Sequence, residues 1–215
     1  MEIRIIIYGY VISYFYSVSY SMKPLRFIHV SKTGGQSIAV AAKNQASLEW
    51  GMFDKDYGIG IHCHRLLSDV YGPSLKNDIM KNQYDWFMVV RNPYDRAVSE
   101  YNWSGAEIDI NVYLKRMISD IEMGFIDSGQ HIVEQYKYLE KKYTIHVLRF
   151  ENLDQEFSEL MKQYNYSIEL KKRVNVSEKR ASLKDLSLET IEYINQVYEK
   201  DFTTFGYEMV HSVFT

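Results

Sequence analysis

The sequence predicts an α/β fold in which helices cover both faces of a central parallel sheet. Three short runs have the apolar, β-branched and aromatic character of buried strands: residues 25–30, 84–90 and 144–150. A stretch with helical periodicity follows each run, and strands that alternate with helices favour a parallel sheet. Because no linker, repeat or change of composition divides the rest of the chain, we expect residues 22–215 to form a single domain.

The helices are predicted from apolar periodicity and from the residues at their ends. Six segments have helical spacing: 37–45, 94–103, 108–123, 131–142, 154–164 and 188–202. Asn92 and Pro93 suit a helix entry after the second strand. Ser187 is a suitable N-cap for the last segment, and Glu189 places a carboxylate in its first turn.

The composition is that of an ordinary globular protein without a global charge signature. Hydrophobic residues make up 46% and charged residues 25% of the chain, and the net charge is −3 at pH 7. That charge gives no footprint for nucleic acid, so we expect no nucleic-acid partner. The single cysteine, Cys63, excludes a disulfide within the chain. It fits a reducing compartment, and a cytoplasmic location is expected.

The N-terminal segment, residues 1–21, is set apart by its lack of charge, since positions 5–21 carry none. Seventeen residues are at the short end for a membrane span, and five tyrosines and four serines make the run polar. It also lacks the basic leader and cleavage site of a secretory signal. Three interpretations stay open: a weak membrane anchor, an extra strand or disordered lead, or an upstream extension of a chain that starts at Met22.

The segment SKTGGQS (residues 31–37) lies where the first predicted strand passes into a helix. Glycines let backbone N–H groups approach a phosphate closely, and a helix N-terminus adds oriented dipoles. A lysine supplies a mobile positive charge, and hydroxyls donate hydrogen bonds. The alternative is a glycine turn with a solvated lysine. The expected phosphate ligands are Lys32, Thr33, Gly34, Gly35, Gln36 and Ser37.

A second anion site is predicted where the second strand runs into RNPYDRAVS (residues 91–99). Arg91 stands at the carboxyl end of the strand, on the edge where open α/β sheets bind ligands. Ser99 on the following helix could share one phosphate with it, whereas the alternative is a structural ion pair between Arg91 and Asp95. The pattern GxxxxGK[ST] and a strand-ending metal aspartate are both absent, which disfavours a P-loop kinase. Two anion sites without a magnesium ligand set fit a ligand with two separate phosphate groups.

FIHVSKTGGQS followed by VVRNPYDRAVSEY resembles the two signature motifs of sulfotransferases that use 3′-phosphoadenosine 5′-phosphosulfate. The carbohydrate branch, with heparan and chondroitin sulfotransferases and small bacterial relatives, is the most similar. Further segments continue the resemblance in order: HIVEQYKYL (131–139), LRFENL (148–153), NVSEKR (175–180) and YEKDFTTFGY (198–207). Gln36 departs from the pattern, because a threonine or serine is usual there.

The resemblance implies a P-loop-NTPase-like three-layer fold and a metal-free transfer of a sulfuryl group to a hydroxyl of a carbohydrate acceptor, with 3′,5′-adenosine bisphosphate as the product. It assigns the first motif to the 5′-phosphosulfate, and Arg91 with Ser99 to the 3′-phosphate. A C-terminal loop with Asn175, Ser177 and Arg180 would close over the nucleotide. The alternative for Arg180 is a solvated position on a charged surface.

The transfer needs a cation at the leaving group and a base at the acceptor. Lys32 is expected to stabilise the charge that develops on the bridging oxygen. His62 and His64 are the candidate bases, since residues i and i+2 of an extended segment point to one face. Heparan sulfate 2-O-sulfotransferases carry a similar His-x-His at this point of the chain. His131 is expected to order the substrate-side loop and not to act in the chemistry.

Other interpretations of these residues stay open. The histidine pair could pack without a catalytic role or bind a metal, although nothing nearby has the spacing of a third and fourth ligand. A glutamate, Glu49 or Glu151, could replace histidine as the base. The same chemistry could act on a small metabolite or a protein tyrosine. A nucleotide-binding protein without turnover, attached to a membrane through residues 5–21, is the alternative from another class.

Overall fold

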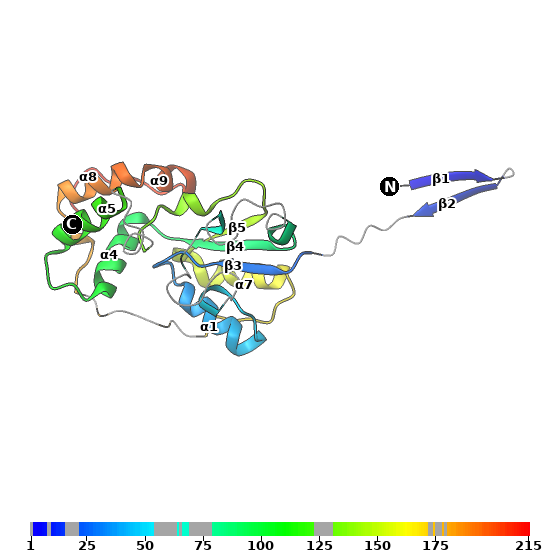
Figure 1. The fold of residues 1–215 in the computed structure, drawn as a ribbon, viewed down its shortest axis with the longest axis horizontal. Coiled ribbons are helices and arrows are strands. Elements are labelled where there is room, and N and C mark those ends of the chain that lie inside the picture. The colour runs from blue at the N-terminus through cyan, green and yellow to red at the C-terminus, as the bar shows by residue number, and fades with distance from the viewer. Residues whose placement is uncertain are drawn as a thin grey trace.

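The computed structural model is an α/β protein with a three-stranded parallel sheet flanked by helices (Figure 1). It describes residues 22–53, 64, 66–68, 79–122, 131–171, 174, 178 and 180–215, and the backbone of 2–7 and 10–15. The strands are β3 (Leu25–Ile28), β4 (Asp85–Val90) and β5 (Ile145–Arg149). The predicted strands and their parallel arrangement are confirmed, and each strand is one or two residues shorter than predicted.

The register of the sheet brings the carboxyl ends of its strands to one edge. β4 is the central strand. Its Phe87 lies opposite Phe27 of β3, and its Val90 lies opposite Arg149 of β5. The segments that follow the strands therefore meet at this edge. They are the loop 31–34, Arg91, and the 3₁₀ helix η4 (Phe150–Asn152).

The helices lie in two groups (Figure 1). Helices α1 (Gly35–Ala46) and α7 (Leu153–Gln163) lie along one face of the sheet. The others gather beyond the carboxyl ends of the strands: α4 (Pro93–Ser104), α5 (Ile110–Glu122), α8 (Leu188–Val197) and α9 (Glu199–Phe205). Short 3₁₀ helices complete the described elements: η1 (Gly51–Phe53), η3 (Gln135–Tyr138) and η5 (Leu183–Asp185).

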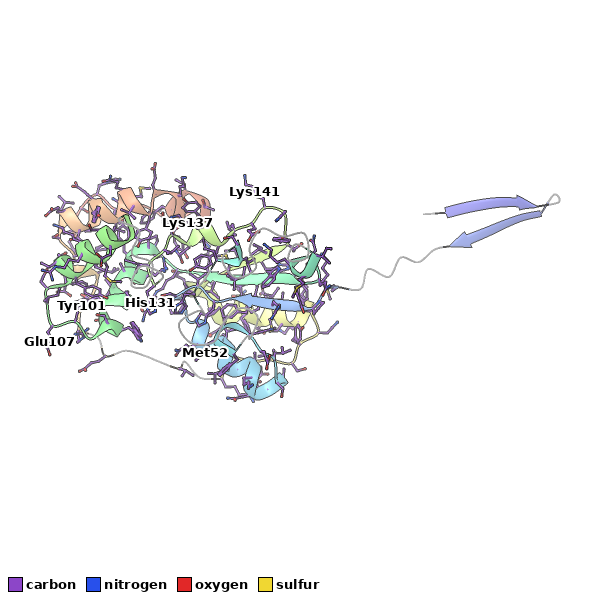
Figure 2. The ribbon with its side chains drawn as sticks, in the orientation of Figure 1. Met52, Tyr101, Glu107, His131, Lys137 and Lys141 are labelled. Atoms are coloured by element: carbon purple, nitrogen blue, oxygen red, sulfur yellow. The ribbon has the colours of Figure 1, made fainter. Side chains whose placement is uncertain are left out.

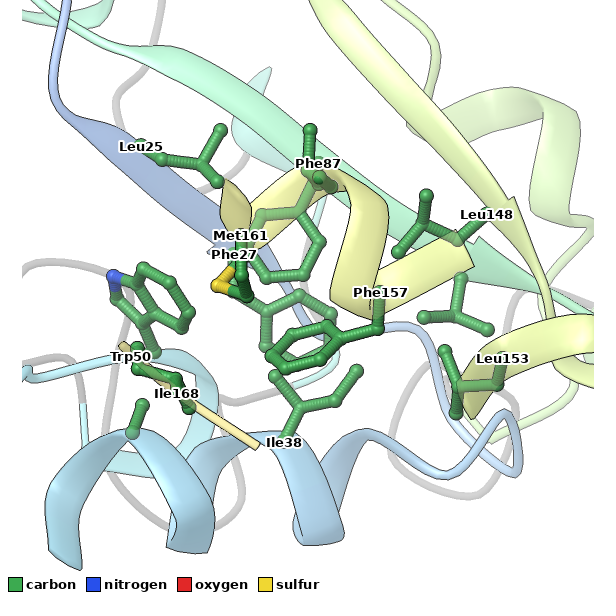
Figure 3. Close-up of a cluster of buried hydrophobic side chains, with 13 residues drawn as sticks. Leu25, Phe27, Ile38, Trp50, Phe87, Leu148, Leu153, Phe157, Met161 and Ile168 are labelled. Carbon is green, nitrogen blue, oxygen red and sulfur yellow. The ribbon is translucent and has the colours of Figure 1, made fainter. Parts of the chain in front are cut away.

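Strands β3 and β4 are buried on both faces, and their alternate side chains point to opposite sides of the sheet, whereas the edge strand β5 is partly exposed. Phe27 and Phe87 face α1 and α7, where they pack with Ile38, Phe157 and other apolar side chains (Figure 3). The opposite face carries a second cluster: Ile28, Val30, Leu67, Trp86, Met88, Val90, Tyr138, Tyr143 and Phe205. This two-sided burial explains why the strands read as nearly continuous apolar runs.

The predicted helix over residues 131–142 is wrong, because only Gln135–Tyr138 turns, as a 3₁₀ helix. Asp201 of α9 is the physical reason. Its carboxylate accepts hydrogen bonds from the backbone N–H groups of Gln135 (2.9 Å) and Tyr136 (2.8 Å). A side chain distant in the sequence thus binds two N–H groups at the start of this turn.

The predicted helix over residues 188–202 is two helices, which break at Tyr198. The Ser187 cap is confirmed, since its hydroxyl accepts a hydrogen bond from the N–H of Thr190 at 3.2 Å. The buried Tyr198 hydroxyl donates to the carbonyl of Ile132 at 2.6 Å. This bond fixes the ring at the point where α8 ends and α9 begins.

The N-terminal strands β1 (Glu2–Ile7) and β2 (Tyr10–Phe15) pair with each other in an antiparallel sheet of their own (Figure 1). Within the described ranges, no helix has the length and apolar character that a membrane crossing requires.

Candidate functional site

The loop that follows β3 has the backbone shape of an anion-binding turn. Lys32 and Gly34 have positive φ angles, 63° and 82°, and Thr33 between them does not. Alternating handedness turns successive N–H groups toward one side, the geometry of an anion-binding nest. Helix α1 begins directly afterwards, at Gly35. A lysine in the left-handed region is uncommon, and such strained residues cluster at functional sites.

The loop hydroxyls hold the loop and its neighbours together. Thr33 is buried, and its hydroxyl donates to the carbonyl of Val30 at 2.9 Å. The Ser37 hydroxyl accepts a hydrogen bond from the N–H of Val174 at 2.9 Å. This bond brings the chain next to Asn175 onto the first turn of α1, although Asn175 and Ser177 themselves lie outside the described residues. Gln36 is partly exposed in the same turn.

Gly35 is required by close packing against His29. A Cβ atom at Gly35 would lie 2.2 Å from Cδ2 and 2.4 Å from Nε2 of the His29 ring. Since His29 is 3% exposed, the ring has little room to move away. A glycine at position 35 was predicted because it lets a phosphate approach closely. The structure gives a second reason for it, since an imidazole packs directly against the start of the helix.

We expect Gly35→Ala to lower the free energy of unfolding by about 1–3 kcal/mol through overpacking. Urea titrations followed by circular dichroism would measure the loss. Gly105→Ala is the matched control, because no heavy atom lies within 4 Å of its Cβ while its φ is +73°. It should cost only left-handed strain, about 1 kcal/mol. Equal losses in both variants would contradict the steric explanation.

Arg91 lies beside the loop. Its Nη1 donates to the carbonyl of Lys32 at 3.3 Å, and its guanidinium stacks 4.2 Å from the ring of Phe150. Gln135 binds both backbone groups of Arg91, accepting from its N–H and donating to its carbonyl, each at 2.9 Å. Asp201 in turn accepts from the N–H of Gln135. The two predicted anion sites therefore meet, with Arg91 fixed from two sides.

Arg96 is a second arginine at the loop, which the sequence reasoning did not single out. It is 2% exposed and donates to three carbonyls, those of Ser31 (3.0 Å), Val133 (2.8 Å) and His131 (3.0 Å). It joins the loop after β3 to the segment before η3. Helical spacing was the sequence signal that could have identified it, because Arg96 lies on the buried face of α4 together with Ala97 and Glu100.

Lys32 extends toward α4, where its Nζ lies 4.8 Å from the ring of Trp103. Burial lowers the pKa of Lys32 to about 8; Glu100 opposes this shift, and Arg91 and Arg96 add to it. A partly desolvated ammonium near two guanidinium groups creates a strong local positive potential. A bound anion would reduce the repulsion between these cations.

Three imidazole rings lie beside this cationic group, with His64 in contact with both of the others. The ring of His64 lies 4.9 Å from His29 and 4.7 Å from His131, edge to face in both cases. Burial lowers the pKa of His29 to about 4 and that of His64 to about 2, so both are neutral at pH 7. His62, the other predicted base, lies outside the described residues. His29 and Glu100 were not predicted as parts of the site.

His29 should make the protein lose stability in mild acid. Its pKa is lowered in the folded state, so the unfolded chain binds the proton more readily as the pH falls from 6.5 to 4. The pKa difference corresponds to about 3 kcal/mol when fully developed. Urea midpoints measured from pH 7 to pH 4 should fall less steeply in His29→Gln than in the wild type. His211→Gln, an exposed control, should keep the wild-type slope.

The remaining predicted residues have the following places. Arg180 donates to the carbonyls of Tyr101 (2.7 Å) and Ala106 (2.6 Å), so it caps the end of α4. Ser99 is partly exposed on α4, and Glu49 is exposed after α1. Glu151 accepts hydrogen bonds from the Asn92 N–H and the Tyr207 hydroxyl, both at 2.9 Å. In the part of the chain that the structure describes, no three His, Cys, Asp or Glu side chains are placed to hold a metal ion.

Comparisons with protein-family models, with curated proteins and with solved structures found no match to this chain. The function is therefore inferred from the residues and from the geometry of the site.

Proposed function

We propose that this protein is a sulfotransferase that moves a sulfuryl group from 3′-phosphoadenosine 5′-phosphosulfate to a hydroxyl of a carbohydrate acceptor. The observation that carries the proposal is the bond between Arg91 and the Lys32 carbonyl, which joins the two segments predicted to bind anions at one edge of the sheet. The similarity of both segments to the sulfotransferase motifs supports it. The same similarity underlies our proposal that the fold is P-loop-NTPase-like, whereas the proposed cytoplasmic location rests on the single cysteine of the chain.

The residues present fit a ligand with two separate phosphate groups. The nest formed by residues 32–34 and the start of α1 would hold the 5′-phosphosulfate, with Lys32 beside it. Arg91, whose backbone Gln135 fixes, would hold the 3′-phosphate together with Ser99. The segment with Asn175 and Ser177 would close over the nucleotide, and Arg180 would anchor that segment on α4.

The donor supplies a sulfuryl group that is already activated by its phosphate leaving group. As the acceptor oxygen bonds to sulfur, the bond from sulfur to the bridging oxygen breaks, and the electron pair stays on that oxygen. Lys32 and the loop N–H groups would stabilise the new charge. A nearby imidazole, with His62 and His64 as the candidates from sequence, would take the proton of the acceptor hydroxyl.

Incubation with the donor carrying labelled sulfur tests the proposal directly. The acceptors would be glycans, tyrosyl peptides, phenols and small hydroxylated metabolites, and we expect label on glycans. Label confined to peptides or metabolites would show that the acceptor is not a carbohydrate, while the proposed sulfuryl transfer would stand. Tight binding of 3′,5′-adenosine bisphosphate without any transfer would indicate a non-catalytic binder. Phosphate transfer from ATP and magnesium would overturn the proposal.

A further inference from the structure

A buried carboxylate faces one of the three imidazoles. Glu100 of α4 is 2% exposed, and its Oε2 lies 3.1 Å from Nδ1 of His131. The hydroxyl of Tyr113 in α5 lies 3.5 Å from the other carboxylate oxygen. When Nδ1 carries the proton and donates a hydrogen bond to Glu100, the other ring nitrogen, Nε2, keeps a lone pair that can accept a proton.

The His131 ring is held in place and still reaches solvent. Trp103 packs on it with ring centroids 4.6 Å apart, and His64 contacts it edge-on. The carbonyl of His131 accepts hydrogen bonds from the Ser31 hydroxyl (2.7 Å) and from Arg96 (3.0 Å). The side chain remains 23% exposed. Its backbone is thus tied to the loop that carries Lys32, while part of the side chain is open to solvent. Figure 2 marks the position of His131 in the fold.

Trp103 connects this imidazole to the cationic group. Half of the Trp103 surface is exposed, and the same indole contacts the Lys32 ammonium and the His131 ring. The imidazole and the ammonium therefore both contact one indole, which brings a proton acceptor and a cation into the same site. The charged and titratable groups around His131 are Glu100, Arg96, His29 and His64, with Tyr113 reached through Glu100 and Lys32 through Trp103.

We infer that His131 is the general base of the transfer and that Glu100 is its positioning residue. The inference rests on the proposed function. Nε2 of His131 takes the proton from the acceptor hydroxyl as its oxygen bonds to sulfur. The bond from sulfur to the bridging oxygen breaks, and the electron pair goes to that oxygen beside Lys32. Glu100 holds the Nδ1 proton and stabilises the imidazolium that forms, as the carboxylate does in a Ser-His-Asp triad.

This assignment gives the neighbouring histidine a different role from the predicted one. Burial makes His64 a poor proton acceptor, whereas His131 has a carboxylate partner and a partly exposed side chain. The main-chain carbonyl of His64 also accepts a hydrogen bond from the buried Tyr138 hydroxyl at 2.5 Å. His64 then serves as the packing partner that keeps the His131 ring from turning.

The test is the pH dependence of transfer in matched variants. We expect His131→Ala to lower kcat at least about 100-fold, the usual contribution of a general base. The affinity for 3′,5′-adenosine bisphosphate should stay within about twofold, and added imidazole should restore part of the rate. Glu100→Gln should lower kcat about 10-fold and alter the acidic limb of the kcat profile, because a neutral amide no longer stabilises the imidazolium that forms. His211→Ala should change neither quantity.

His131→Gln replaces the alanine variant if that one fails to fold, with circular dichroism as the check. A wild-type rate and acidic limb in the His131 variant would overturn the assignment. The assignment would also be overturned if the acidic limb of the kcat profile disappeared only in His62→Ala or His64→Ala. In each of these outcomes the wild type still transfers the sulfuryl group, so the assignment of the base would fail while the proposed function would stand. A wild type that transfers no label would overturn the proposed function and this assignment together.

Discussion

Replacing Lys32 by alanine is expected to lower kcat about 100- to 1,000-fold, the usual cost of removing one group that stabilises a developing oxyanion. The ammonium lies beside Trp103, on the loop whose left-handed residues shape the nest. Because its charge would act mainly on the breaking bond, the loss should be larger in kcat than in the affinity for 3′,5′-adenosine bisphosphate. Steady-state transfer rates and calorimetric titrations would separate the two effects.

The pH dependence gives this prediction a second signature. Since the pKa of Lys32 is about 8 in the free protein, the affinity for the bisphosphate should fall as the pH rises through 8. An anion prefers the protonated lysine, so the decline is expected in the wild type and should vanish in Lys32→Ala. Lys43→Ala, an exposed lysine of α1, is the control. A wild-type rate in the Lys32 variant would remove this residue from the mechanism.

Arg91→Ala is expected to weaken the binding of 3′,5′-adenosine bisphosphate about 100-fold, as when a buried charge that bonds an anion is lost. Two effects add in this variant. The guanidinium is lost as a phosphate ligand, and its hydrogen bond to the Lys32 carbonyl no longer holds the loop. Transfer should therefore become undetectable at ordinary donor concentrations.

Arg91→Lys should restore little of this loss. A lysine cannot reproduce both the bond to the Lys32 carbonyl and the planar stacking on Phe150. Arg116→Ala on the exposed side of α5 controls for a change in net charge. If Arg91→Lys and Arg91→Ala both bind the bisphosphate like the wild type, the 3′-phosphate is held elsewhere. Unfolding by urea would show whether either variant is destabilised.

The predicted fold was correct where short-range pattern decides structure and wrong where a distant side chain does. β3 and β4 were found because their side chains are buried on both faces, which leaves an apolar run in the sequence. The edge strand β5 was found from its short apolar and β-branched run, although Val147 is exposed. Helix α4 was found from Asn92 and Pro93, and the Asn92 side chain does accept from the N–H of Tyr94 at 3.0 Å. The turn around Gln135 was misread as part of a helix, because the carboxylate that shapes it belongs to Asp201.

The candidate site shows the same division. Lys32 and Arg91 were selected from their positions after apolar strands, since parallel strands bring such positions to one edge. Glu100 was missed because a glutamate on a helix is usually a solvated residue, and only packing reveals that it is buried. His29 was missed because a histidine inside an apolar strand has no partner that sequence spacing can identify.

The sequence alone determined the class of the fold, the two segments proposed as anion sites, and the cations expected in them. These features depend on periodicity, turn residues and strand ends, which are local properties of the chain. Only the tertiary structure decided that Gln135 and Asp201 fix Arg91, that Arg96 ties the loop to residues 131–133, and that Glu100 meets His131. Those contacts join residues 31 to 66 positions apart. Such distances in sequence are closed by packing, and no local pattern encodes them.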